Sequence, residues 1–287
     1  MKIGINLVLW TDTLSDDRLP LLEKCKNIGY DLVELSVFDT DLKVAEKWGK
    51  RLDELGLERS GGCAFGPDHN MIDSNPQVRR RGIDAGKVTI DFTAAAGARI
   101  LIGHMPSALG VFSGQGPTGE EWKRGIEAMQ ELSEHAEQLD VTIGLEAVNR
   151  FECYLFNCMA DTLRFVNDVG HKRCQLMYDT FHANIEEKDV AAAIRSVKDH
   201  LVHVHISECD RSTPGQGGVR WKETFDTLHE IGYDGYLVCE AFGSALPKLA
   251  AATKIWREMF QSTDQLAKDA HDFMRKQVAE RWRNTVK

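Results

Sequence analysis

Two histidines, His203 and His205, occupy one side of a strand that the sequence predicts at residues 201–207. In the segment HVHISECDR they alternate with apolar residues, and Arg211 follows directly after the strand. Burying such polar groups costs free energy unless a partner compensates them. The pattern therefore indicates that something at the end of this strand, a ligand or an ion, pairs with the polar side chains.

Acidic residues stand near the ends of three further predicted strands: Glu146, Asp179 and Glu240. Together with His205 they would present one carboxylate or imidazole from each of four consecutive strands. Carboxylates packed together repel and raise one another's pKa unless a cation lies among them. Three oxygen donors and one imidazole suit Mn²⁺, Mg²⁺ or Co²⁺ better than structural Zn²⁺, which prefers sulfur and nitrogen. We therefore expect these four residues to bind one divalent metal ion, with Mn²⁺ as the first candidate.

Each of these residues alone also fits a solvated strand end or a hydrogen-bonded core position. Their common place on adjacent strands is what favours a site. His203, one pleat deeper than His205, is expected to be a hydrogen-bonded interior residue. The cysteines at 63, 153, 209 and 239 have no activating base nearby in the sequence, so packing is their expected role.

Eight strand-like segments, separated by helical segments, would position these residues. The predicted strands span residues 2–9, 31–37, 57–65, 99–105, 141–148, 174–180, 201–207 and 235–242. Alternation of this kind, with crossover-length connections, implies parallel strands covered by helices. It predicts an α/β fold, a closed (β/α)8 or TIM barrel, in which catalytic groups stand at the C-terminal ends of the strands. An open doubly wound sheet would need a glycine-rich turn where the chain has LWTDTLSDD.

The bulk properties limit the location and the partners. The chain of 287 residues is expected to form a single domain, with the barrel at about 1–262 and a C-terminal helical extension at about 263–287. A net charge of -9 argues against a nucleic-acid partner. Seven cysteines without a CxxC pair indicate reduced thiols in the cytoplasm. The N-terminal apolar run is too short to span a membrane and has no small-residue cleavage site.

Three segments resemble those of a known enzyme family. They are GLEAVNRFE (144–152), MYDTFHANIEE (177–187) and HVHISECDR (203–211), and VCEAFG (238–243) and KIWRE (254–258) extend the likeness. The chain is similar here to the ketose 3-epimerases, the D-tagatose 3-epimerase and D-psicose (D-allulose) 3-epimerase family, within the xylose isomerase-like TIM barrels. The resemblance is close in the C-terminal half and extends only to the general layout in the N-terminal half.

The resemblance implies roles for individual residues. Glu146, Asp179, His205 and Glu240 would be the metal ligands, and the two glutamates would also be the catalytic acid/base groups. Glu152, His182 and Arg211 would hold the reacting end of the sugar. Cys63 resembles a pocket residue of D-tagatose 3-epimerase.

The chain departs from the family's pattern in the first strand. Many sugar epimerases carry an aromatic residue there, whereas this chain has Asn6 and Leu7. Asn6 is therefore a candidate substrate contact, and the identity of the sugar stays open. Trp10, at the end of that strand, is a candidate apolar wall of the pocket or a core residue.

The implied activity is metal-dependent epimerisation at C3 of a free ketose of the D-tagatose, D-psicose (D-allulose), D-fructose or L-ribulose type. One glutamate would remove the proton next to the C2 carbonyl, and the other would return a proton to the opposite face. The metal ion would stabilise the cis-enediolate between these steps. A phosphorylated substrate stays open because glycines occur in the segment RSTPGQGGVRW (211–221). The family's pattern also implies a homodimer or homotetramer.

Three other functions are consistent with a metal site in such a barrel. An aldose–ketose or hydroxypyruvate-type isomerase of the same barrel family would use a similar metal and similar glutamates to move a proton between C1 and C2. A metal-dependent abasic-site endonuclease would need more strand-end histidines and a basic surface. A non-catalytic sugar-binding barrel is the third alternative.

Overall fold

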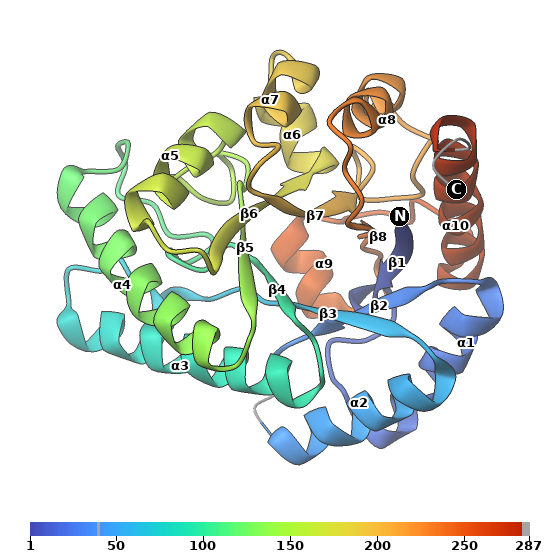
Figure 1. Cartoon of the computed structure of the whole chain (residues 1–287), viewed down its shortest axis with the longest axis horizontal. Coiled ribbons are helices and arrows are strands. Elements are labelled where there is room, and N and C mark those ends of the chain that lie inside the picture. The colour runs from blue at the N-terminus through green and yellow to red at the C-terminus, as the bar shows by residue number, and fades with distance from the viewer. Residues whose placement is uncertain (39–40, 283–287) are drawn as a thin grey trace.

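In this computed structural model, which describes residues 1–38 and 41–282, parallel strands form a closed barrel that follows the order of the chain from β1 to β8 (Figure 1). Strand β8 pairs with β1 and closes the ring. The predicted (β/α)8 barrel is confirmed. The strands are β1 (Lys2–Asn6), β2 (Leu32–Ser36), β3 (Glu58–Gly62), β4 (Ile100–Gly103), β5 (Thr142–Glu146), β6 (Cys174–Asp179), β7 (Leu201–Ile206) and β8 (Tyr236–Cys239).

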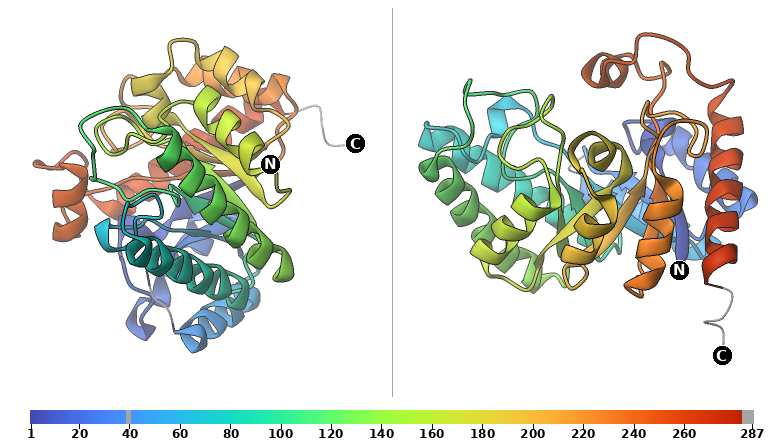
Figure 2. Two further views of the ribbon diagram at one scale, coloured as in Figure 1. Left: turned by 90° about the vertical axis from the view of Figure 1, so that its left-hand side faces the viewer. Right: turned by 90° about the horizontal axis from the view of Figure 1, so that it is seen from above.

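Helices surround the barrel on its outer side (Figures 1 and 2). Three of them, α1, α2 and α5, end at glycines: Gly29, Gly56 and Gly170 are C-caps with φ of 110°, 62° and 66°. The helices are α1 (Pro20–Ile28), α2 (Leu42–Leu55), α3 (Pro76–Ala95), α4 (Gly119–Gln138), α5 (Met159–Val169), α6 (Thr180–Glu186), α7 (Val190–Ser196), α8 (Trp221–Glu230), α9 (Pro247–Thr253) and α10 (Thr263–Arg281). None of the helices in the described ranges combines the length and apolar character that crossing a membrane requires.

The first strand is shorter than the sequence predicts. Instead of running to residue 9, β1 ends at Asn6, whose side-chain oxygen accepts a hydrogen bond from the Val8 N–H at 3.0 Å. The chain then turns into a short 3-10 helix, η1 (Leu7–Leu9), which is fully buried. An Asn side chain offers the backbone this local alternative to a sheet ladder. Strand β8 likewise stops before Glu240.

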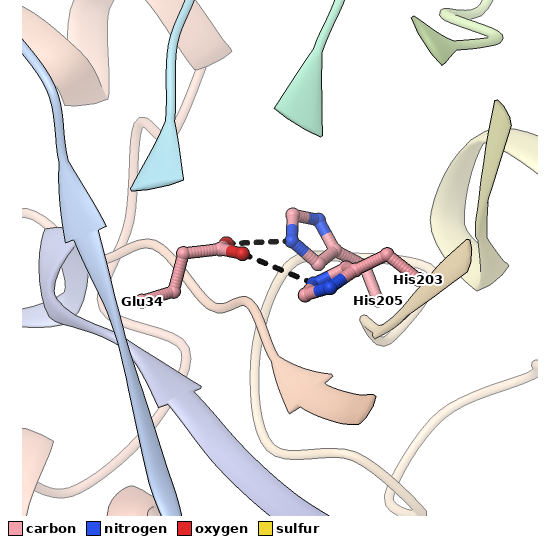
Figure 3. A group of neighbouring side chains, drawn as sticks. All are labelled: Glu34, His203 and His205. Atoms are coloured by element: carbon pink, nitrogen blue, oxygen red, sulfur yellow. Dashed lines mark hydrogen bonds and ion pairs between the residues drawn. The ribbon is translucent and has the colours of Figure 1, made fainter. Parts of the chain in front are cut away.

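Strand alternation places polar side chains inside the barrel in layers. Glu34 of β2 and both histidines of β7 point inward and meet in the middle of the barrel (Figure 3). Nearer the N-terminal ends of the strands, Lys2 and Tyr236 both contact Glu58. Inward-facing side chains at the C-terminal ends of the strands therefore lie above a polar layer.

The C-terminal helix α10 lies beside β1 and β8, outside the barrel (Figure 1). Its buried side chains are Leu266, Ala267, Ala270 and Met274. The hydroxyl of Tyr30 donates a hydrogen bond to the Ala267 carbonyl at 2.7 Å. The predicted extension past the eighth unit is thus present, although residues 283–287 lie outside the described residues.

Substitution of Met274 tests whether α10 stabilises the barrel. Met274 is fully buried in the main core, so Met274→Ala should lower the free energy of unfolding by about 2–5 kcal/mol through lost burial and a cavity. Equilibrium urea unfolding measures this change. The exposed Lys276 on the same helix is the matched control, and Lys276→Ala should stay within about 0.5 kcal/mol of wild type. Equal stability of both variants would show that α10 contributes little.

Candidate active site

Three carboxylates and one imidazole meet at the C-terminal ends of β5 to β8. Glu146 and Asp179 are the last residues of their strands, His205 is the last but one of β7, and Glu240 follows β8 directly. One potential ligand atom from each residue lies within 4.8 Å of the others. The structure therefore brings together all four residues that the sequence nominates as metal ligands.

The charges of this group act strongly on one another. Burial, and then the carboxylates of Glu240 and Asp179, raise the pKa of Glu146 well above its ordinary value. Burial acts against charge on Asp179 too, but Arg211 and His205 hold the pKa of that carboxyl far below its usual range. The crowding of the acids therefore disfavours the ionised form of Glu146.

The imidazole of His205 is oriented for metal binding. Its Nε2 donates a hydrogen bond to Glu34 Oε1 at 2.7 Å (Figure 3). Its Nδ1 lies 3.5 Å from both Asp179 and Glu240 and, although buried, has no hydrogen-bond partner among the described residues. A histidine that donates one ring nitrogen to a carboxylate and presents the other to a group of acids is the usual arrangement of a metal ligand. This donor set fits a hard divalent cation.

Glu34 is the centre of the layer below. Its side chain is fully buried, and its oxygens accept hydrogen bonds from Asn6 Nδ2 at 2.9 Å and Ser60 Oγ at 2.8 Å. His203 Nε2 lies 3.0 Å from the same carboxylate. Burial alone would raise the pKa of Glu34, but His205 and His203 hold it far below its ordinary value. Glu34 is therefore an anionic support beneath the proposed metal ligands.

A cavity of about 610 Å³ opens above these residues. Several predicted site residues line it: Asn6, Cys63, Glu146, Glu152, His182, Arg211 and Glu240. The side chains of Glu146 and Glu240 are 13% and 12% exposed, whereas those of Asp179 and His205 are fully buried. The two glutamates are thus the acids of this group that reach the cavity. Helix α9 borders the opening through Leu249, Ala252 and Thr253.

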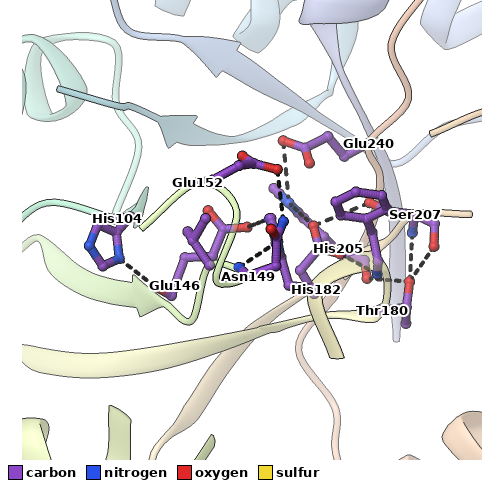
Figure 4. Close-up of polar contacts among 12 residues, drawn as sticks. His104, Glu146, Asn149, Glu152, Thr180, His182, His205, Ser207 and Glu240 are labelled. Carbon is purple, nitrogen blue, oxygen red and sulfur yellow. Dashed lines mark hydrogen bonds and ion pairs between the residues drawn. The ribbon is translucent and has the colours of Figure 1, made fainter. Parts of the chain in front are cut away.

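His182 forms a hydrogen-bonded group with the loop after β5 (Figure 4). Its Nδ1 accepts the Asn149 backbone N–H at 3.1 Å, and the Asn149 side-chain amide lies 2.9 Å from the same nitrogen. Asn149 also donates to Glu152 at 2.8 Å. Burial and the adjacent Arg211 lower the pKa of His182 to about 3, so its ring is neutral. Its Nε2 lies 3.0 Å from Arg211 Nη2 and 3.4 Å from Glu146.

Arg211 is fixed at the rim of the acidic group. Its Nη1 donates to Asp179 at 3.2 Å and to Glu240 at 2.7 Å. Its guanidinium carbon lies 3.8 Å from the ring centre of Phe181 and 4.8 Å from that of Phe242. These cation–π contacts restrict the orientation of the guanidinium group, and the Arg211 side chain is 93% buried. The backbone of Arg211 has a φ of 65°, a conformation that non-glycine residues rarely adopt.

The loop that carries Arg211 is organised by a buried carboxylate. Glu208 accepts hydrogen bonds from the backbone N–H groups of Gly215 at 2.9 Å and Val219 at 3.1 Å. It also accepts one from the Trp221 indole at 3.0 Å. Its own carbonyl accepts the Arg211 N–H at 2.9 Å. Gly215 of this glycine-containing loop therefore donates its N–H to a protein carboxylate.

Three candidate pocket residues differ in their placement. Trp10 is not among the described residues that line the cavity; its indole N–H donates at 3.3 Å to Asp264, in the first turn of α10. Asn6 lines the cavity, but its amide nitrogen bonds Glu34 and its oxygen caps Val8. Cys63 lines the cavity as a buried free thiol whose pKa is raised by burial and by Glu146.

Sequence reasoning missed several residues that support the site. Glu34 is the main one, and the available signal was an acid in the middle of the apolar strand LVELS. His104 donates from Nδ1 to the Glu146 backbone carbonyl at 2.9 Å (Figure 4). The Thr180 hydroxyl donates to the Ser207 carbonyl at 2.7 Å and accepts the Ser207 N–H at 2.8 Å. The first contact links the ends of β4 and β5, and the Thr180 contacts link the ends of β6 and β7.

Comparisons with known proteins agree with this geometry. The family described as xylose isomerase-like TIM barrel matches residues 22–277. An L-ribulose 3-epimerase from Mesorhizobium japonicum is 33% identical over 95% of this chain and 93% of its own length. A D-psicose 3-epimerase from Enterocloster bolteae is 32% identical, with 96% and 95% covered. A solved structure of an L-ribulose 3-epimerase superposes with a TM-score of 0.93 at 33% identity, covering 98% and 96% of the two chains.

Glu34 should control how tightly the site binds a metal ion. Glu34→Gln removes the negative charge that orients His205, so Mn²⁺ affinity should fall about 10–100-fold, as measured by isothermal titration calorimetry. Ser60→Ala, which removes one donor to Glu34 and leaves both imidazole contacts, should weaken binding less. Circular dichroism confirms that each variant is folded. Unchanged Mn²⁺ affinity in folded Glu34→Gln would contradict the supporting role.

Proposed function

This chain belongs to the xylose isomerase-like TIM barrels and, within them, to the ketose 3-epimerases, and on this premise we propose that it inverts C3 of a free ketose with the help of one divalent metal ion. The observation that carries the proposal is the pair formed by Glu146 and Glu240. They come from strands that are not neighbours in the barrel, and both reach the cavity beside the buried Asp179 and His205. Two acids placed in this way can serve the two faces of one carbon atom.

Epimerisation at C3 needs a base on each face of the sugar. A single base would return the proton to the face from which it came. In the proposed reaction, the ionised glutamate on one side removes the C3 proton, and the protonated glutamate on the other side supplies a proton to the opposite face. The roles exchange for the reverse reaction. The two carboxyl groups therefore start in opposite protonation states and finish with those states exchanged.

The proposed metal ligands are Glu146, Asp179, His205 and Glu240. A divalent ion held there, with Mn²⁺ preferred and Co²⁺ or Mg²⁺ as alternatives, supplies Lewis-acid polarisation of the C2 carbonyl.

The remaining residues would hold the reacting end of the sugar. Arg211, fixed between two aromatic rings, carries N–H donors close to both Asp179 and Glu240 and can stabilise negative charge that develops on the C1 and C2 oxygens. His182 is neutral and lines the cavity in the same region, where Arg211 holds its ring in place. Glu152, which already accepts from Asn149, can accept from a sugar hydroxyl. A homodimer or homotetramer remains our prediction for the assembly.

Metal removal and a panel of ketoses test the proposed function. Purified protein supplied with Mn²⁺ should convert at least one of D-tagatose, D-psicose, D-fructose and L-ribulose into its C3 epimer, as measured by chromatography. Chelation should abolish this conversion, and Mn²⁺ or Co²⁺ should restore it. Formation of an aldose would instead indicate an aldose–ketose isomerase. Full activity in rigorously metal-free protein would overturn the metal-dependent mechanism.

Conservative substitution of the two glutamates tests the two-base mechanism. Glu146→Gln and Glu240→Gln each keep one oxygen donor but cannot accept the C3 proton, so each should slow epimerisation by about 10²–10⁴-fold. Each variant should still exchange the C3 hydrogen of one epimer with solvent deuterium, and the two variants should differ in which epimer exchanges. Proton NMR in D2O measures this exchange.

The controls separate base loss from metal loss. Metal content is measured in both variants and matched by added Mn²⁺. Glu230→Gln, which alters a surface carboxylate paired with Arg195, should keep wild-type rates. If both metal-loaded glutamine variants epimerise at near wild-type rates, the assignment of Glu146 and Glu240 as the two bases is wrong.

A further inference from the structure

Polar groups are distributed unevenly around the cavity. The side formed by β5 to β8 carries charged and amide side chains: Glu146, Asn149, Glu152, His182, Arg211 and Glu240. The side formed by β2 to β4 is lined by Ser36, Phe38, Gly62, Cys63, Ala64 and Ile102. With C1 to C3 of a ketose placed against the first group, the rest of the sugar must extend toward the second.

Ser36 is the one hydroxyl-bearing side chain among the described residues that line this second side. It is the last residue of β2 and lies two positions after Glu34, so strand alternation directs its side chain into the barrel above Glu34. The residue is only 2% exposed, and its Oγ has no hydrogen-bond partner among the described residues. A buried hydroxyl without a partner is unfavourable and therefore needs an explanation.

The surroundings of Ser36 leave room for a ligand. Its partner in the neighbouring strand is Gly62, which has no side chain. Cys63, the next residue, offers only a weak thiol donor. Another hydroxyl of the same cavity, that of Thr253, already donates to the Leu249 carbonyl at 2.8 Å. Ser36 thus differs from Thr253 in having its hydrogen-bonding capacity still available.

We propose that Ser36 is a specificity-determining residue whose hydroxyl hydrogen-bonds the C5 or C6 hydroxyl of the ketose. This inference rests on the proposed epimerase function, because that function fixes which end of the sugar lies at Glu146 and Glu240. A buried protein hydroxyl that pairs with a substrate hydroxyl disfavours analogues that lack it, since the protein group is then left unpaired. Ser36 therefore favours substrates with a hydroxyl at the far end.

Ser36→Ala and a matched series of sugars test the proposal. The sugars are a ketohexose that the wild-type protein epimerises and its 5-deoxy and 6-deoxy analogues. On the ketohexose, Ser36→Ala should lower kcat/KM about three- to tenfold, mainly through KM. On the analogue that lacks the contacted hydroxyl, wild type and variant should be equal. Ser196→Ala is the control: its hydroxyl donates to the Ala193 carbonyl on α7, away from the cavity, so any change should be small and the same for all three sugars.

The outcomes distinguish this inference from the proposed function. Epimerisation by wild type together with an equal loss on every sugar, or with no loss on the ketohexose, would overturn the role of Ser36 and leave the epimerase function standing. If the wild type epimerises no ketose, calorimetric binding of the same three sugars to the Mn²⁺-loaded proteins still decides whether Ser36 contacts a far-end hydroxyl. Thermal unfolding and metal content confirm that the variant is intact.

Discussion

The structure depends on the crowding of three carboxylates in one buried place. Oxygens of Glu146, Asp179 and Glu240 lie within 4.8 Å of one another, where burial leaves little water to screen their repulsion. Several surrounding features are compensations for this repulsion. Arg211 is pinned against two of the acids by aromatic rings, and His205 is placed between them. A divalent cation held among these groups would supply further positive charge.

The barrel makes this crowding possible because it fixes both the direction and the height of each side chain. Four adjacent strands deliver the four groups at one level, and hydrogen bonds from His104 and Thr180 fix the strand ends. Below that level, Glu34 reaches across the interior from β2 to β7. The proposed metal ligands are thus held by the barrel wall and by the layer beneath them, with loops contributing the groups that we propose to contact the sugar.

The sequence predicted the barrel and the meeting of the four strand-end residues because both follow from local periodicity. The alternation of residues along a strand predicts which side chains face the barrel interior, and the C-terminal ends of parallel strands lie at one edge of the sheet. Glu34 was missed because its importance depends on His205, which is 171 residues away in the chain and opposite in the barrel. Trp10 was a candidate pocket wall or core residue, and it packs against the core; the capping of Val8 by Asn6 turns the chain before it, and no strand pattern reveals this turn. The unpaired hydroxyl of Ser36 likewise appears only when its neighbours are known.

The network around Glu34 has a consequence for how such a protein can change over time. Asn6, Glu34, Ser60, His203 and His205 share one buried carboxylate, so the cost of altering one member depends on the state of the others. Single replacements leave a charge or a donor without a partner, whereas concerted replacements need not. These five positions should therefore covary among descendants of a common ancestor. Residues of the cavity wall can change one at a time and alter substrate preference, whereas the five positions around Glu34 are expected to change together.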